Sequence, residues 1–292
     1  MEIKIYGNRG SIPVPGEQSV KYGGNTPCIR VCDDSGENYL ILDAGSGIRM
    51  LGNEIVAQNS IKNIDIVITH SHWDHIQGLP FFKPLYTKDF SVNVYAPGDA
   101  IKIVEDIINI QMLPKYFPVG PEVFKANIKY FNLEEGEPFN IKSFQLNSIQ
   151  NHHSPGTFSY KVSSKGKNFV YMTDNEIYFE AEKRDEPELK IVKRLNEKLI
   201  DFCKGTDLLI HDIMYTPEDY KERIGWGHSC TKSTAFFASL VNPEKLVYFH
   251  YDPDYSDEQI DAIINSAQEM LSALNDKIES IPSMQNLTMI IK

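Results

Sequence analysis

One six-residue stretch says more about this chain than any other: His70-Ser71-His72-Trp73-Asp74-His75. It places three of the chain's eight histidines and a carboxylate within six positions. His70 and His72 stand two positions apart, so in an extended segment their side chains point the same way. Imidazole nitrogens and carboxylate oxygens are the ligands of zinc and similar divalent ions. The stretch therefore predicts a site for one or two ions, the alternative being a polar loop that happens to be rich in histidine.

Length and composition indicate a globular protein. The chain has 292 residues, 41% of them hydrophobic and 24% charged, which is enough for one large core or two modest ones. It has no run of about 18 apolar residues that could span a membrane. Its first residues, Met1–Tyr6, are typical of a strand rather than of an export leader, and its four cysteines form no CxxC pair. We expect a cytoplasmic protein with reduced, buried thiols and no membrane partner.

The formal net charge of −11 bears on the substrate. An acidic chain without a basic block is poorly suited to displace counterions from a long nucleic acid, so we expect no long nucleic acid as a partner. Two bound divalent ions would nevertheless make one cleft attractive to anions. A small phosphate ester therefore remains a substrate that fits the charge.

Short apolar runs between turn signals predict strands in two groups, with no internal repeat or linker. The first group is Ile3–Tyr6, Cys28–Cys32, Tyr39–Leu42, Ile64–Thr69 and Ser91–Ala96. The second sheet is expected to contain Ile128–Phe131, Phe144–Ile149, Phe158–Val162 and Phe169–Thr173, and Leu208–Ile210 and Lys245–Phe249 are further strands. Helices are expected over Ala100–Gln111, along the stripe from Ile191 to Phe202, and over Ser256–Leu274. The pattern predicts one α/β domain over residues 1–292.

Several polar residues follow apolar strands directly. The cluster around His75 follows Ile64–Thr69, and Asp174, His211 and His250 each end or follow a later strand. Chemistry beyond the carboxyl ends of core strands is common in α/β folds, so these donors should gather at one sheet edge. A lone histidine in such a place is usually structural, but the shared placement of all four favours a site.

The motif Thr69-His-x-His-x-Asp-His75 resembles that of the metallo-β-lactamase superfamily. Leu42-Asp43-Ala44-Gly45 and Tyr171-Met172-Thr173-Asp174 are similar to other motifs of that family. The resemblance covers nearly the whole chain and implies a four-layer αβ/βα sandwich, with two mixed sheets and helices outside. Further likenesses to the tRNase Z and cyclic phosphodiesterase branch lie in segments 7–13, 22–28, 211–212, 227–229 and 249–250.

The resemblance also implies a ligand set for two divalent ions. One ion would take His70, His72 and His153, the other would take Asp74, His75 and His250, and Asp174 would bridge them. His152 is adjacent to His153 and is the alternative; His153 is preferred because it stands seven residues before Tyr160, as the family's ligand does. Zinc suits these donors best, with manganese and iron as alternatives.

Roles in catalysis follow from the chemistry of a dinuclear site. Two ions activate water and neutralise phosphoryl oxygens, so phosphodiester hydrolysis suits the site, with Asp74 as a catalytic residue. An alkoxide leaving group needs a proton, for which His211 is the expected acid, oriented by Asp212. Asp43 either accepts a hydrogen bond from a ligand imidazole or caps a turn. His228, in a glycine turn, either contacts substrate phosphate or holds the loop.

Only 21 positions separate His153 from Asp174, the interval where tRNase Z carries an inserted tRNA-gripping arm. We therefore expect a phosphodiesterase for small or cyclic phosphodiesters. The alternatives are a tRNase Z-like endoribonuclease, a thioester, lactone or β-lactam hydrolase on the same metals, and a non-hydrolytic sensor. Residues 177–204 and Met112–Pro121 are where an insertion could shape a pocket or a dimer contact, and a homodimer is one arrangement that the sequence leaves open.

Overall fold

The computed structural model describes residues 1–98, 105, 108–154, 156–179 and 187–291, and two seven-stranded sheets form its centre. The first sheet has the spatial order β14 (Thr288–Ile290), β1 (Glu2–Gly7), β2 (Cys28–Cys32), β3 (Tyr39–Leu42), β4 (Asn63–Val67), β5 (Ser91–Pro97) and β6 (Asn127–Leu133). Strands β3 to β6 run parallel, and the remaining pairs are antiparallel.

The second sheet mirrors this arrangement. Its order is β13 (Glu279–Pro282), β12 (Lys245–Phe249), β11 (Leu208–Asp212), β10 (Lys167–Met172), β9 (Phe158–Ser164), β8 (Phe144–Gln150) and β7 (Phe139–Ile141). Strands β10 to β13 run parallel, whereas β7 to β10 form an antiparallel meander. Each sheet is therefore mixed, as the sequence predicts.

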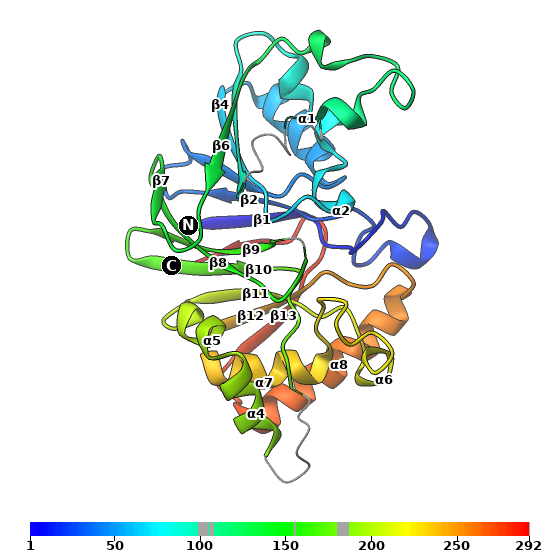
Figure 1. The fold of residues 1–292 in the computed structure, drawn as a ribbon, viewed down its shortest axis with the longest axis vertical. Helices are drawn as coiled ribbons and strands as arrows, with labels where there is room; N and C mark the ends of the chain where they lie inside the picture. The colour runs from blue at the N-terminus through cyan, green and yellow to red at the C-terminus, as the bar shows by residue number, and fades with distance from the viewer. Residues whose placement is uncertain (99–104, 106–107, 155, 180–186, 292) are drawn as a thin grey trace.

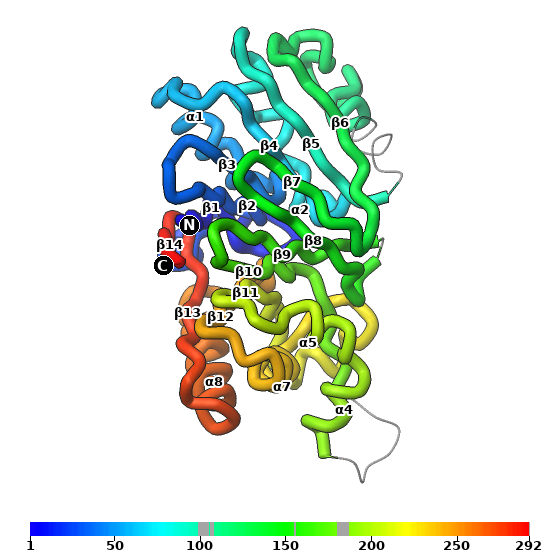
Figure 2. Tube along the Cα trace, turned by 90° about the vertical axis from the view of Figure 1, so that its left-hand side faces the viewer, coloured from blue at the N-terminus to red at the C-terminus, as the bar shows by residue number. Residues whose placement is uncertain are grey.

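Helices cover the outer face of each sheet (Figure 1). The α-helices are α1 (Ile48–Gln58), α2 (Trp73–Ile76), α4 (Glu188–Leu195), α5 (Glu197–Cys203), α6 (Pro217–Tyr220), α7 (Thr231–Val241) and α8 (Asp257–Leu274). Short 3₁₀ helices are η1 (Glu17–Ser19), η2 (Leu79–Phe81), η3 (Lys83–Tyr86) and η4 (Pro121–Val123). Figure 2 shows α1 beyond one sheet and α4, α5, α7 and α8 beyond the other, so the layers run helix, sheet, sheet, helix.

The alternation of side chains along each strand produces these layers. In β3, Ile41 packs toward α1, whereas Leu40 and Leu42 lie in the core between the sheets. In β10, Val170 packs toward the α7 and α8 layer, whereas Tyr171 joins the core between the sheets. Because one hydrophobic core takes residues from both sheets, we propose that residues 1–292 form one domain.

The expected sandwich is confirmed, and two details differ from the sequence prediction. The strand that contains Ile128–Phe131 was expected in the second sheet but pairs in parallel with β5 in the first. The expected helix from Ile191 to Phe202 is two helices, because the Asn196 side chain bonds the Val192 and Tyr178 carbonyls at the break. Most of the predicted helix Ala100–Gln111 lies outside the described residues.

The carboxyl ends of the parallel strands in both sheets point to one common edge, where β3 and β4 from one sheet meet β10, β11 and β12 from the other. The segments that leave these strands form the site described below. No helix within the described ranges combines the length and hydropathy that a membrane span requires.

Candidate dinuclear metal centre

Tight turns at strand ends aim the donor side chains into the site. Asp43 and His250 directly follow β3 and β12, and Asp174 comes two residues after the end of β10. All three have positive φ angles, of 60° for Asp43, 49° for Asp174 and 62° for His250. A positive φ is uncommon outside glycine and reverses the direction of the chain within one residue. Each turn therefore keeps a polar side chain at the common edge, whereas a continued strand would carry that residue past the edge.

The first group of donors contains His70, His72, His153 and Asp174. The Nδ1 atom of His72 lies 2.9 Å from Nε2 of His153. Oδ2 of Asp174 lies 3.5 Å from Nε2 of His70 and 3.8 Å from Nε2 of His153. Four ligands about 2.0–2.1 Å from a tetrahedral ion stand roughly 3.3–3.4 Å apart, so this spacing suits one ion.

The second group contains Asp74, His75, Asp174 and His250. Oδ1 of Asp174 lies 3.2 Å from Nε2 of His75 and 3.3 Å from Nε2 of His250. Oδ2 of Asp74 lies 3.1 Å from Nε2 of His250 and 3.4 Å from Nε2 of His75. Asp174 therefore turns one oxygen to each group, which is the geometry of a carboxylate that bridges two ions.

Unsatisfied polar atoms show that the centre suits cations. Nε2 of His70 and Nε2 of His75 are buried without a hydrogen-bond partner, and both point into the donor groups. A buried polar atom without a partner is costly, and coordination to an ion would remove that cost. The seven residues expected as ligands thus meet in the structure, and their donor atoms are compatible with two divalent ions.

The electrostatics of the two groups differ. Burial, with neighbouring imidazoles, keeps the pKa of His70 well below its usual value and lowers that of His153 to about 4 despite Asp174. These rings are neutral and have lone pairs to donate. Around His75, Asp174, Asp74 and Asp43 outweigh burial and raise its pKa well above the usual value. This half of the site therefore attracts positive charge, which a divalent ion would supply.

Asp43 lies directly behind one of the donors, which is the first of the two alternatives that the sequence leaves open. Its Oδ2 accepts a hydrogen bond from Nδ1 of His75 at 2.8 Å and another from the Tyr171 hydroxyl at 2.9 Å. Its Oδ1 accepts from the Thr69 amide at 2.8 Å. These bonds keep the Nδ1 proton of His75 in place and leave Nε2 facing the centre.

The adjacent histidines 152 and 153 have different positions. Nδ1 of His153 donates to the Gly227 carbonyl at 2.9 Å, and its Nε2 enters the first donor group. His152 instead stacks its ring on Tyr178, with 4.2 Å between ring centroids, and bonds the Glu176 carbonyl. The structure therefore brings His153 to the site, and His152 faces elsewhere.

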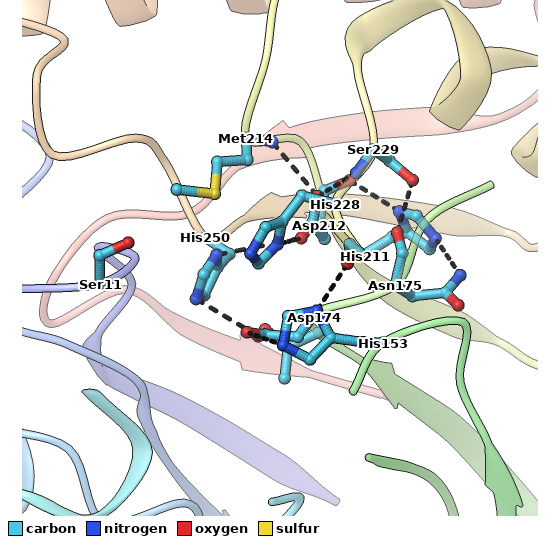
Figure 3. Close-up of polar contacts among 12 residues, drawn as sticks. Ser11, His153, Asp174, Asn175, His211, Asp212, Met214, His228, Ser229 and His250 are labelled. Carbon is cyan, nitrogen blue, oxygen red and sulfur yellow. Dashed lines mark hydrogen bonds and ion pairs between the residues drawn. The ribbon is translucent and has the colours of Figure 1, made fainter. Parts of the chain in front are cut away.

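His211 does not reach the centre, contrary to the expectation that it is the acid. It is fully buried on the side of β11 that faces α7, where it packs on Phe237 and lies 3.4 Å from the Thr234 hydroxyl. Figure 3 shows its ring on the Asn175 side of Asp212, away from His250. His211 and Asp212 are consecutive strand residues, so their side chains point to opposite faces and only Asp212 faces the site.

The partner of Asp212 in the site is His228. Nδ1 of His228 lies 2.6 Å from Oδ2 of Asp212, and the other Asp212 oxygen accepts from the Ser229 amide at 2.9 Å. The His228 ring stacks on His250 at 5.1 Å and lies 4.8 Å from the His153 ring, between centroids. Burial alone would lower the pKa of His228, but Asp212 outweighs it and raises that pKa to about 9. A proton donor thus lies beside both donor groups (Figure 3).

Two backbone contacts that support donor residues were not predicted from the sequence. The Ser11 amide, at a positive φ of 62°, donates to Oδ2 of Asp74 at 2.7 Å. Gly10 packs against the His250 ring so closely that a Cβ there would lie 2.6 Å from Cε1. The turn Gly7-Asn-Arg-Gly10 is the signal for this contact, because close backbone approach favours glycine.

The fold and the site define a metal-dependent hydrolase class. Residues 38–251 match the family model described as "Beta-lactamase superfamily domain", and this chain belongs to that superfamily. It is a hydrolase of the metallo-β-lactamase type with a dinuclear site for divalent metal ions.

Curated relatives cover most of the chain. Ribonuclease Z of Picrophilus torridus is 25% identical, over 93% of this chain and 91% of the relative. Ribonuclease Z of Thermoplasma volcanium is 26% identical, over 88% of this chain and 89% of the relative. The expectation that a long nucleic acid is excluded as a partner is therefore wrong. That expectation was based on the net charge of the chain and on the missing arm. The net charge of a whole chain does not describe the electrostatic potential in a cleft that binds divalent cations.

Solved structures share the fold. The metallo-beta-lactamase fold protein YhfI from Bacillus subtilis has a TM-score of 0.71 at 13% identity and covers 99% of this chain and 98% of its own. A diphosphatase from the PhnP family has a TM-score of 0.66 at 18% identity, with 100% and 98% covered. Human tRNase Z, short form, has a TM-score of 0.63 at 17% identity, with both chains covered completely.

Proposed function

We propose that this chain hydrolyses phosphodiester bonds, and that the Asp212–His228 pair protonates the leaving alkoxide. The pair is the observation that carries the proposal, because a proton donor beside the metals is needed when the leaving group is a poor one. Thioesters need such an acid less, because a thiolate is a good leaving group. The relatives named ribonuclease Z support the same bond type, with RNA as the substrate class.

Small or cyclic phosphodiesters are the second candidate substrates. The specific observation in their favour is that β9 and β10 fill the interval between His153 and Asp174 as a plain hairpin. A small diester needs no inserted arm, because it fits within the site itself. RNA and small diesters share the reacting group, so one mechanism serves both.

Different residues would hold the ions, orient the ligands and accept a proton. The first donor group would hold one ion and the second would hold the other, and zinc is the metal that four close imidazole and carboxylate donors favour. Bound divalent ions lower the pKa of water toward about 7 and neutralise phosphoryl oxygens. Asp43 and the Gly227 carbonyl orient His75 and His153, and Asp74 accepts the proton of the attacking water.

His228 acts at the other side of the reacting phosphorus. Asp212 holds Nδ1 of His228 at 2.6 Å, so Nε2 is the atom that is left to give a proton to the leaving oxygen. Two bonds from the Ser229 and Met214 amides hold Asp212 itself. The carboxylate thus stabilises the charged imidazole and fixes its direction.

A substrate panel tests this proposal. Protein reconstituted with zinc or manganese is assayed against bis(p-nitrophenyl) phosphate, a cyclic nucleotide, an RNA with a 3′ extension, a thioester, a lactone and a β-lactam. We expect metal-dependent hydrolysis of diesters that a chelator abolishes. Hydrolysis of a thioester, lactone or β-lactam without any diester hydrolysis would reject the proposal, and so would a fully metallated protein that hydrolyses none of them.

A further inference from the structure

A cavity of about 640 Å³ opens directly beside the first donor group, and His72 and His153 form part of its wall. This size lies within the range of sites that bind small organic molecules. The phosphodiesterase mechanism uses the two histidines and the Gly227 carbonyl but assigns no role to the other side chains of the cavity. A substrate whose phosphate reaches the metals would place its neighbouring group here.

Aromatic side chains line part of this cavity. His152 and Tyr178 stack with their ring planes 15° apart, and the carbonyl of Glu176 holds His152 at 3.0 Å. Trp226 also lines the cavity, and 63% of its surface is exposed. The chain has two tryptophans, and a large, exposed indole beside a metal site is well placed to contact a bound ligand.

The loop that carries Trp226 is held rigidly. The Glu176 carboxylate is 1% exposed and accepts hydrogen bonds from the Gly225 amide at 2.9 Å, the Gly227 amide at 3.0 Å and the Tyr220 hydroxyl at 2.6 Å. The Gly227 carbonyl in turn holds His153. The backbone on both sides of Trp226 is therefore held relative to the first donor group, so stacking on the indole would cost little loop entropy.

Polar side chains also line the cavity. Gln150, Lys198 and Glu135 line the cavity and are exposed, so donors and acceptors are both available. A flat ring with hydrogen-bonding edges suits a cavity that is lined by both aromatic and polar side chains. Aromatic side chains stack on every type of base, since each base presents a π-face.

From this arrangement we infer that the cavity is a nucleobase subsite, in which the base next to the cleaved phosphate stacks on Trp226. The inference rests on the proposed phosphodiesterase function and specifies its substrate as a nucleotide diester. It assigns Trp226 to substrate binding, outside the metal-binding and proton-donating residues.

The first test measures binding without turnover. Trp73→Phe leaves Trp226 as the sole tryptophan of the full chain, so its fluorescence reports on the cavity. We expect adenosine 5′-monophosphate to quench this fluorescence in the metal-loaded protein, and ribose 5-phosphate, which lacks a base, to leave it unchanged. Equal responses to the two ligands would overturn the inference.

The second test measures cleavage of two matched RNAs, one intact and one with an abasic residue next to the cleaved bond. We expect the missing base to lower kcat/KM roughly 5- to 100-fold in the wild type, the range typical of one lost stack. The Trp226→Ala variant should cleave the two RNAs with almost equal kcat/KM. The Trp226→Phe variant should keep most of the wild-type preference for the intact RNA. Ile290→Ala, an exposed residue on β14 away from the cavity, serves as the control.

The two proposals can fail separately. An enzyme that hydrolyses bis(p-nitrophenyl) phosphate but treats intact and abasic RNA alike has no nucleobase subsite here, although it is a phosphodiesterase. The opposite result is also possible: adenosine 5′-monophosphate quenches the Trp226 fluorescence, ribose 5-phosphate does not, and the protein hydrolyses no diester. That result would support the subsite and contradict the proposed function.

Discussion

Nδ1 of His228 lies 2.6 Å from Oδ2 of Asp212, although 15 residues separate them in the sequence. Asp212 ends β11, and His228 lies in the loop before α7. The bond places the His228 imidazole next to His153, a member of the first donor group, and next to His250, a member of the second. In the proposed mechanism, this contact links the metal centre to acid catalysis.

Replacement of His228 should separate acid catalysis from metal binding. We expect His228→Ala to retain its metal and to lose roughly 10²–10⁴ in kcat for diesters with alkoxide leaving groups. The loss should be much smaller with p-nitrophenolate, which departs without a proton. Steady-state rates over a series of leaving groups, with metal content measured alongside, give this comparison.

His211 is the matched control for that experiment. Because it is buried against α7, His211→Asn should lower the free energy of unfolding and leave the dependence of rate on the leaving group unchanged. A leaving-group dependence that changes in His211→Asn and not in His228→Ala would return the acid role to His211.

Asp174 should control the binding of both ions. We expect two divalent ions per wild-type chain after reconstitution and fewer than one in Asp174→Ala, because its two oxygens face different donor groups. Elemental analysis of the dialysed protein measures this. Asp201→Ala removes an exposed carboxylate on α5 and should keep the wild-type content. Two tightly held ions in Asp174→Ala would show that this carboxylate is no bridge.

Glu176→Gln should loosen the loop that holds His153. The carboxylate accepts from two backbone amides, and a glutamine would turn its own NH₂ group toward one of them. We expect a loss of about 1–3 kcal/mol in unfolding free energy and weaker retention of one ion. Urea unfolding and metal titration measure the two effects. Glu188→Gln, which changes an exposed ion pair, is the control, and equal behaviour of both variants would contradict the proposed positioning role.

Asp33 should make stability depend on acid pH. Burial alone would raise the pKa of Asp33, but bonds from the Asn38, Ser35 and Ser143 side chains at 2.6–2.8 Å outweigh it and hold the pKa well below its usual value. A lowered pKa in the folded state stabilises it above the unfolded value of about 3.9. That stabilisation is lost as the pH falls through the folded value.

Asp33→Asn should therefore be less stable than the wild type at pH 7, by about 1–3 kcal/mol. The difference should narrow as the pH falls below about 4, where the wild-type carboxyl in the unfolded chain takes up a proton. Urea unfolding at several pH values measures it. A difference that stays constant from pH 7 to pH 2 would contradict the lowered pKa.

Much of the site could be predicted because its residues have local signals. The histidine cluster, Asp174 and His250 each follow a strongly apolar strand, and the carboxyl ends of parallel strands meet at one edge. Strand bounds were accurate for the same reason: β2 and β3 coincide with the apolar runs Cys28–Cys32 and Tyr39–Leu42. Helix α7, rich in small polar residues, has no comparable pattern and was missed.

The sequence by itself determined the superfamily fold, because that depends on strand patterns and on motifs of adjacent residues. It predicted the donor residues through the resemblance, and it predicted Asp212 as the acidic partner of His211. Tertiary structure alone decided which histidine accompanies Asp212. Alternation along β11 turns His211 into the helix layer, and the loop fixed by Glu176 brings His228 to the other face. The placement of β6 in the first sheet was decided in the same way, since strand pairing is a long-range contact that no local pattern encodes.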